Sequence, residues 1–236
     1  MNITSSYQVR IVNCSVNLND TVRIYQEALS YLIGIVNENW DAVKSITVGA
    51  LEQQRYIEKL VHGNKNREAK YPEFDKKFYK YPSYLRRATI TAAIGAVSSY
   101  QSNLANWENT DKQTAVPTLQ VDRKSFPTFF RDDMFEVEGA PEKVKVPKNP
   151  KAKDKLTPEE KKIEKEKRQA AQLKNSQNEI TALNDKHTVY LKVYHKNDWV
   201  WATVTLRKTD IAYLRKYWMH ACALSLIHIS EPTRRT

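Results

Sequence analysis

Cysteine is scarce in this sequence. Only Cys14 and Cys222 occur in 236 residues, too few for a disulfide framework or a cysteine-based zinc site. The five histidines show no HxxxH spacing and no Cys/His ligand pattern, so the sequence offers no recognisable metal centre. We therefore expect no cofactor in this chain, and a reducing cytoplasm as its compartment.

Long apolar runs are absent as well. No run approaches the ~20 residues that cross a bilayer, and the N-terminus lacks the basic and apolar regions of a secretory signal. We therefore expect no membrane partner. The 41% of hydrophobic residues nevertheless supplies enough apolar surface for one large or two small domains.

Positive charge is concentrated in one segment. The chain carries a net charge of +11, and residues 143–174 hold 12 Lys/Arg against 5 Asp/Glu. A basic balance favours nucleic acid or an acidic membrane surface, whereas the ordinary alternative is a solvated insertion. Because apolar anchors are few, we expect a mobile insertion over 138–183. Within it, Thr157-Pro158-Glu159-Glu160 predicts the start of a charged helix over 161–173.

The stretch 81–107 predicts a long helix around which the chain is organised. Its apolar residues recur three, four or seven positions apart, and Ser83 is the expected N-cap. These apolar residues are Leu85, Ile90, Ile94, Val97, Leu104 and Trp107. Arg86 and Arg87 lie in the first turn, where the helix dipole disfavours cations. They either meet an anionic partner or face water.

The connector before this helix, residues 64–81, mixes aromatic residues with lysines. Such a mixture stacks on bases and pairs with phosphates in nucleic-acid-binding proteins. The alternative, which we favour, is a packed connector whose aromatics fill a core. The aromatics concerned are Tyr71, Phe74, Phe78, Tyr79 and Tyr81.

Other patterns predict further helices and strands. We expect a strand at Tyr7–Val16, short strands between 114 and 137, and helices from Asn19 or Asp20 to Trp40, from Ser45 to Val61 before a C-terminal Gly63, and at Asp210–Trp218. From 188 onwards, alternation on both sides of Lys196-Asn197-Asp198 predicts a β-hairpin. Trp199 and Trp201 should share one face of it, and Val200, Ala202 and Val204 the other.

The tail has a different character. Residues 224–234, LSLIHISEPTR, resemble the translation of a widely used transposase-based sequencing adapter. We therefore expect the native sequence to stop near Ala223, and residues 224–236 to be derived from the adapter.

Three motifs occur in a familiar order: YPSYLRRATITAAIGAVSSYQSNLANWE, SFPTFFRDDMFEV and LKVYHKNDWVWATVTL. Together they resemble TnpB, the RNA-guided nuclease of bacterial insertion sequences, which is related to type V CRISPR effectors. The resemblance covers most of residues 1–223. It implies an α+β fold in which a helical recognition domain is inserted into a wedge β-barrel: a first wedge strand at 1–18, helices at 19–113, and wedge strands at 114–223.

The resemblance also implies a function. The chain would be the N-terminal half of an RNA-guided DNA endonuclease in the bacterial cytoplasm, bound to guide RNA and target DNA at the nucleoid. The family's RuvC-like domain and zinc ribbon, which need magnesium and zinc, lie further on, so no catalytic residue carries over. Two alternatives are a nuclease-free DNA-binding regulator of the same fold and a helical protein–protein interaction domain.

Ten residues are the candidates for nucleic-acid contact: Lys77, Lys80, Tyr84, Arg86, Arg87, Lys124, Arg131, Lys192, Trp199 and Trp201. Asp132 and Asp133 are the most tempting metal ligands. Adjacent residues on a strand point to opposite faces, so the two carboxylates are not expected to share an ion. We therefore expect binding without cleavage, since two-metal hydrolysis needs carboxylates grouped around ions ~4 Å apart.

Overall fold

The computed structural model describes residues 11–110, 114–121, 125–130, 133–146, 157–218 and 223–225. These ranges hold seven helices and six strands, which confirms the predicted mixture of helix and sheet. The chain divides into two compact units. The sheet unit comprises residues 1–16, 134–191 and 201–222, and the helical unit comprises residues 17–133, 192–200 and 223–236.

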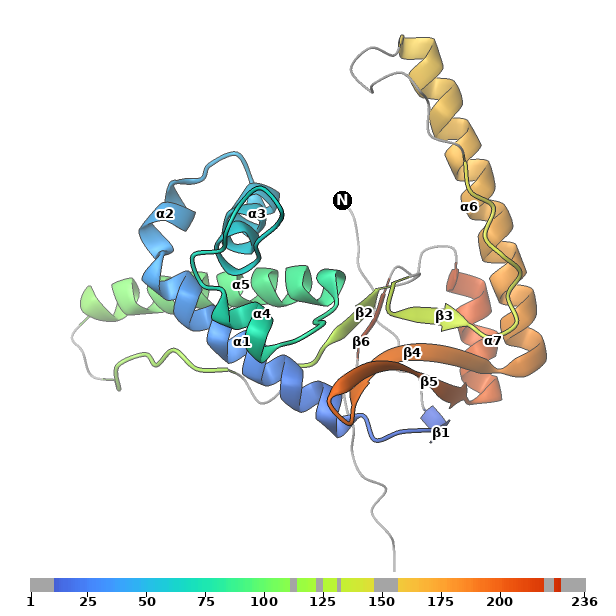
Figure 1. Cartoon of the computed structure of the whole chain (residues 1–236), viewed down its shortest axis with the longest axis horizontal. Coiled ribbons are helices and arrows are strands. Elements are labelled where there is room, and N and C mark those ends of the chain that lie inside the picture. The colour runs from blue at the N-terminus through green and yellow to red at the C-terminus, as the bar shows by residue number, and fades with distance from the viewer. Residues whose placement is uncertain are drawn as a thin grey trace, which may run out of the picture. The chain divides into compact units, whose positions relative to one another are not determined.

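The helical unit is built on five helices and a short strand pair. The helices are α1 Asn19–Glu38, α2 Trp40–Ser45, α3 Ala50–Val61, α4 Glu73–Lys77 and α5 Ser83–Glu108. The long helices α1 and α5 pack together (Figure 1). Their buried side chains recur at helical spacing, as Leu32 and Val36 do on α1 and Ile90 and Val97 on α5. The organising helix predicted from the sequence is thus confirmed.

Helix boundaries differ from the predictions for local reasons. The first helix ends at Glu38 because the Asn39 side chain donates a hydrogen bond to the Ile35 carbonyl, and the short α2 then follows. The third helix begins at Ala50, after Gly49 at φ 144°, and not at Ser45. At its end His62 turns to extended backbone, so Gly63 does not supply the left-handed residue we expected.

The start of α5 also differs by one residue. Pro82, with φ −56° and ψ 135°, is the N-cap, and no side chain caps the helix. Ser83 is therefore the first helical residue and not the predicted cap.

The connector before α5 contributes to the core. Phe74, Phe78 and Tyr81 are buried. Their rings contact one another at 4.9–6.0 Å between centroids, and Phe74 and Phe78 also contact Tyr31 at 6.0 Å. The packed-connector interpretation is confirmed for these three residues. Tyr79 differs, since 68% of its surface is exposed.

A four-stranded antiparallel sheet carries the sheet unit. Its strands are β1 Ile11–Cys14, β3 Phe135–Val137, β4 Thr188–His195 and β5 Asp198–Leu206, in the order β1-β5-β4-β3. Lys196 and Asn197 have φ values of 48° and 64°, the conformation of a two-residue hairpin turn. The predicted hairpin is confirmed. Closure of this sheet into a wedge barrel stays a prediction.

The two faces of β5 differ as the alternation predicts. Ala202 and Val204 are buried, whereas Trp201 on the opposite face is 44% exposed. Val200 is only half-buried. Separately, β2 Thr128–Phe130 pairs antiparallel with β6 Ala223–Ser225 in the helical unit. Strand β6 thus includes the first two residues of the adapter-like tail.

The predicted charged helix is α6, Pro158–Lys186, and it is longer than expected. Thr157 and Glu160 form a reciprocal capping box with Pro158 at the first helical position, which confirms the predicted start. The expected limit of the insertion at residue 183 falls inside the helix, whose last turns bury Ala182 and Leu183.

Two contacts hold α6 in the sheet unit. The buried Glu179 carboxylate accepts a hydrogen bond from the Trp218 indole at 2.9 Å, next to α7 Lys208–Tyr217. The Asn175 amide bonds both the N–H and the C=O of Val144, so the chain that follows β3 runs beside the helix (Figure 1). In the described ranges, no helix has both the length and the apolar character required to cross a membrane.

Candidate nucleic-acid interface

Four cations of the helical unit lie over aromatic rings within residues 70–87, and we call this group the cation–aromatic strip. Lys70 lies 4.9 Å from the centre of the Tyr71 ring, Lys80 lies 5.4 Å from Tyr79, and Arg87 lies 5.7 Å from Tyr84. Lys77 lies over both Phe78, at 5.4 Å, and Tyr31, at 5.9 Å. The cations of these contacts cluster within one stretch of the described chain.

The strip follows from how the connector folds. The buried Phe74, Phe78 and Tyr81 fix one side of the connector against α1, so the lysines between them face outward. Lys80 takes a left-handed backbone conformation with φ 56°, which is uncommon for a residue other than glycine. Its ammonium group lies 3.3 Å from the Asp198 carboxylate at the hairpin tip.

The strip cations differ in their partners. Lys77 is exposed and has no carboxylate partner among the described residues. Lys80 pairs with Asp198 at a site where both side chains are about half exposed. Exposed ion pairs of this kind contribute at most ~1 kcal/mol, so a phosphate competes for the lysine with little penalty. The hydrogen bond with Tyr71 raises the pKa of Lys70, which stays charged at neutral pH.

Arg86 is not available to a ligand. Its side chain is 8% exposed and donates to the Glu58 carboxylate at 3.1 Å, while its Nε has no hydrogen-bond partner. The sequence left two interpretations open for this residue, contact with an anionic ligand or exposure to water. Neither holds, because the side chain is buried and paired with Glu58 of the same chain. Arg87, the next residue, is 45% exposed and shares the same Glu58 carboxylate through its Nε.

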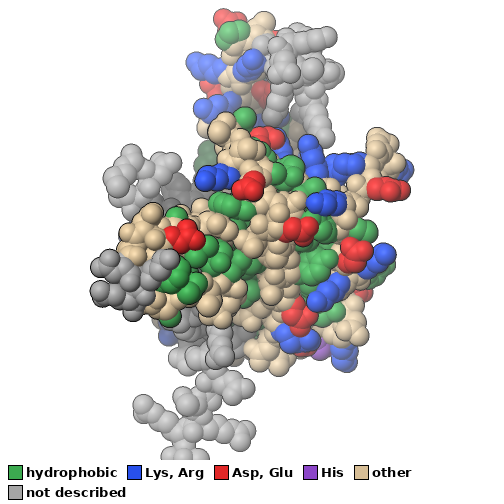
Figure 2. All heavy atoms as spheres, turned by 90° about the vertical axis from the view of Figure 1, so that its left-hand side faces the viewer, with side chains coloured by type: hydrophobic (Ala, Val, Ile, Leu, Met, Phe, Trp, Pro, Cys, Tyr) green, Lys and Arg blue, Asp and Glu red, His purple; other side chains and the backbone are tan. Residues whose placement is uncertain are grey.

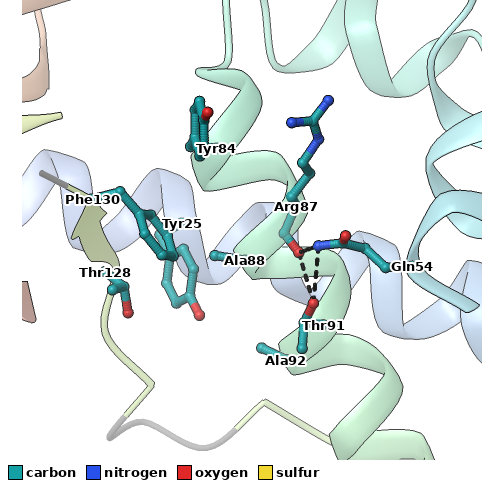
Figure 3. Close-up of a pocket in the computed structure, with 9 residues that line it drawn as sticks. All are labelled: Tyr25, Gln54, Tyr84, Arg87, Ala88, Thr91, Ala92, Thr128 and Phe130. Atoms are coloured by element: carbon teal, nitrogen blue, oxygen red, sulfur yellow. Dashed lines mark hydrogen bonds between the residues drawn. The ribbon is translucent and has the colours of Figure 1, made fainter. Parts of the chain in front are cut away.

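A hollow of about 480 Å³ lies beside Arg87 on the surface of the helical unit. Figure 3 shows its small-residue floor, Ala88 and Ala92 of α5, with the rings of Tyr25 and Phe130 on one side and Gln54 on the other. Tyr84 and Phe130 contact each other at 6.1 Å between ring centres. The hollow therefore combines a small floor, aromatic walls and a cationic edge.

The polar edge of the hollow has a fixed hydrogen-bond pattern. Gln54 Nε2 donates to the Arg87 carbonyl at 2.9 Å and to Thr91 Oγ1 at 3.1 Å, drawn as dashed lines in Figure 3. A carbonyl oxygen only accepts, so the amide nitrogen must face it. Gln54 Oε1 takes no part in these two hydrogen bonds and remains as an acceptor.

The other predicted contact residues are placed as follows. Trp199 packs edge-on against Tyr81 and at a tilt against Tyr194, at 5.5 Å in both cases, and its side chain is half-buried. Lys192, on β4, is half-buried in the helical unit. Trp201 belongs to the sheet unit and is half exposed. Lys124 and Arg131 lie outside the described residues.

Sequence reasoning missed Gln54, Glu58 and Phe130. Glu58 lies 28 residues before Arg86 on another helix, and no local pattern connects the two residues. On the face drawn in Figure 2, basic and acidic side chains are interspersed and form no patch of one sign.

The candidate metal ligands from the sequence are Asp132 and Asp133. Within the ranges that the structure describes, no three His, Cys, Asp or Glu side chains are grouped closely enough to hold an ion. Asp132 lies outside those ranges. The magnesium and zinc that the resemblance implies therefore have no fitting ligand set in the described part of the chain.

Comparison with known proteins gives a match to the model of one protein family. The model of the Aq_aa04 family matches residues 5–148, which is more than half of the chain and includes the strip and the hollow. No curated protein and no solved structure matches the chain.

Proposed function

The chain belongs to the Aq_aa04 family, and we propose that it binds nucleic acid through the cation–aromatic strip. In this proposal the chain supplies guide-RNA and target-DNA binding to a TnpB-like RNA-guided endonuclease. We assign no cleavage step to its residues. The nuclease-free regulator of the same fold, the alternative, would use the same binding surface.

The observation that carries the proposal is the pairing of cations with exposed rings in a single stretch. Tyr79 is 68% exposed and Tyr84 is 42% exposed, and each lies under the cationic group of Lys80 or Arg87. An exposed ring offers a face to an unpaired base, and a neighbouring cation reaches the phosphate of the same nucleotide. If these aromatic residues only filled a core, Tyr79 and Tyr84 would not need to be exposed beside cations.

The resemblance to TnpB supports the assignment to that class of nuclease. It implies a first strand, then recognition helices, then further strands. The described chain has this order: β1 precedes α1–α5, and β2 to β5 follow. Its positive charge also suits a partner made of phosphates, because each neutralised phosphate releases condensed counterions.

The proposal is tested by two triple variants with equal loss of charge. Lys77→Ala/Lys80→Ala/Arg87→Ala removes three strip cations, whereas Arg23→Ala/Lys44→Ala/Lys59→Ala removes three exposed cations of the same unit that lie over no ring. Alanine keeps the Cβ at residue 80, so the backbone strain there is unchanged. Affinity for a stem-loop RNA and for duplex DNA is measured by gel shift at a fixed salt concentration, with circular dichroism as the check of folding.

We expect the strip variant to lose roughly tenfold or more in RNA affinity, since a single charge-assisted hydrogen bond contributes ~1.5 kcal/mol or more. The matched variant should lose much less, and wild-type protein should bind RNA more tightly than duplex DNA. Equal losses in both variants would show that only net charge matters. No binding by wild-type protein would favour the protein–protein interaction domain.

A further inference from the structure

The hollow beside Arg87 has features that general phosphate binding leaves unexplained. Its volume of about 480 Å³ lies within the range of small-ligand sites. Its floor is made of Ala88 and Ala92, and larger residues at these positions would fill it. The helix thus leaves room beside two aromatic walls, where packing alone would favour larger side chains.

The aromatic walls suit a planar ligand. The rings of Tyr84 and Phe130 are inclined at 42° with centres 6.1 Å apart, so they form a corner and do not cover each other. Phe130 is half-buried and Tyr84 is exposed, which leaves ring surface open to the hollow. A flat group entering this corner gains the contact that a base gains on an aromatic platform.

The cationic edge places an anion next to that planar group. Arg87 uses its Nε for Glu58, and its two terminal nitrogens remain for another acceptor. Figure 3 shows the guanidinium at the Tyr84 end of the hollow, directed away from the Ala92 end. The anion would therefore lie at the mouth, and the planar group inside.

The remaining acceptor gives the hollow a polar contact for a base. Gln54 Oε1 takes no part in the hydrogen bonds that fix the amide, so it is available as an acceptor. Every RNA base carries an N–H donor on its pairing edge, whether an exocyclic amino group or the ring N–H of uracil. The acceptor therefore suits a base without selecting one.

We propose that the hollow holds one unstacked nucleobase from an RNA strand whose adjacent phosphate contacts Arg87. This inference rests on the proposed function, because the strand must first be held by the strip. It goes beyond that function by assigning a site for a single base. An apolar peptide segment fits less well, since it would leave the Arg87 charge and the Gln54 acceptor unused.

The test uses stem-loop RNAs that differ in a single bulged nucleotide: adenine, cytosine, uracil or an abasic residue. Affinities are measured by fluorescence anisotropy with the full chain. We expect each of the three bulged bases to bind more tightly than the abasic RNA, with an advantage of about tenfold for adenine, near the low end of base–aromatic stacking. Equal affinity for all four RNAs would overturn the single-base site while leaving the proposed function intact.

Single variants test whether the affinity advantage of the bulged base arises in the hollow. Ala92→Leu fills the hollow and should remove the advantage of the adenine bulge without changing affinity for the abasic RNA. The control Ala105→Leu, at an exposed position on the same helix, should keep that advantage. Gln54→Met removes the Oε1 acceptor and should keep most of the adenine advantage, because the stacking contact remains. Retention of the adenine advantage in Ala92→Leu would contradict the assignment.

Two further measurements address a loss of stability in Ala92→Leu and a free nucleotide as the occupant of the hollow. If Ala92→Leu lowers the melting temperature, Tyr84→Leu tests the same wall from an exposed position. AMP carries the same base with one phosphate and should compete with the RNA only at far higher concentration. Competition by AMP at the concentration of the RNA would make a free nucleotide the occupant and overturn the RNA base. Failure of every RNA to bind would overturn the proposed function as well.

Discussion

The carboxylate of Glu58 lies 3.1 Å from the guanidinium of Arg86, and both side chains are largely withdrawn from water. Glu58 is 16% exposed and Arg86 is 8% exposed. The same carboxylate reaches the more exposed Arg87. One acidic residue of α3 thus pairs with two neighbouring arginines of α5, and their burial divides them into a structural one and an accessible one.

This division predicts a large effect of Glu58→Ala on stability. Removal of the carboxylate leaves the Arg86 charge buried and unpaired, which costs about 3 kcal/mol or more of unfolding free energy. The control is Glu52→Ala on the same helix, whose partner Arg55 is exposed, and it should cost below about 1 kcal/mol. Urea unfolding of the two variants measures the difference. Equal, small effects would mean that Arg86 is not buried in solution.

The two hairpin tryptophans should respond differently to truncation. Trp199 contacts Tyr81 and Tyr194, so Trp199→Ala should lower the unfolding free energy by about 2–3 kcal/mol. Trp201 is 44% exposed, and Trp201→Ala should cost clearly less. Thermal unfolding compares the two variants, and RNA affinity is measured alongside. A loss of RNA affinity in Trp199→Ala without loss of stability would show that Trp199 contacts RNA and does not mainly pack against its neighbours.

The loss of fold stability at alkaline pH should report the burial of Tyr81. Desolvation raises the pKa of its phenol well above the ordinary tyrosine value, and its Oη lies 3.1 Å from Thr89 Oγ1. A raised pKa stabilises the fold fully below the unfolded pKa near 10, and this contribution is lost as the pH rises beyond it. Tyr81→Phe should therefore flatten the decline of stability between pH 9 and pH 11. An unchanged decline would place Tyr81 in water.

Amide exchange should divide α6 into two parts. Side chains of residues 161–173 are mostly exposed, with Ile163 and Leu173 at 50% and 55%, whereas Ser176, Glu179 and Leu183 are buried. A helix without tertiary packing is marginally stable in water. Amides at 161–173 should therefore exchange many times faster than those at 179–186, and Thr157→Ala should accelerate the first group further by removing the capping box. Uniform protection along α6 would show that its first half is covered.

Much of the secondary structure could be predicted because its signals are local. The apolar spacing of 81–107 gave α5, alternation around Lys196 and Asn197 gave the hairpin, and Thr157-Pro158 gave the start of α6. Each of these elements is specified by residues within a few positions of one another. The connector could also be assigned to the core, because its aromatics outnumber what a solvated loop of that length would carry.

The candidate site could be predicted only in part, because its geometry depends on distant pairs. Arg86 and Arg87 are adjacent and chemically identical, and both pair with Glu58 on another helix; only their burial in the fold distinguishes them. The hollow draws on α1, α3, α5 and β2. No single stretch carries a signature of it. In the sequence Gln54 is an ordinary polar helix residue, and only its hydrogen bond to the Arg87 carbonyl in the fold marks it as part of the hollow.

The most direct test of strip binding is the salt dependence of RNA affinity for single variants of the two arginines. Log affinity against log salt should be steep for wild-type protein, because phosphate contacts release counterions. Arg87→Ala should reduce the slope by roughly one, whereas Arg86→Ala should leave the slope unchanged while lowering the unfolding free energy. A flat slope for wild-type protein, or an equal reduction of the slope by both variants, would contradict an interface formed by the exposed cation–aromatic strip.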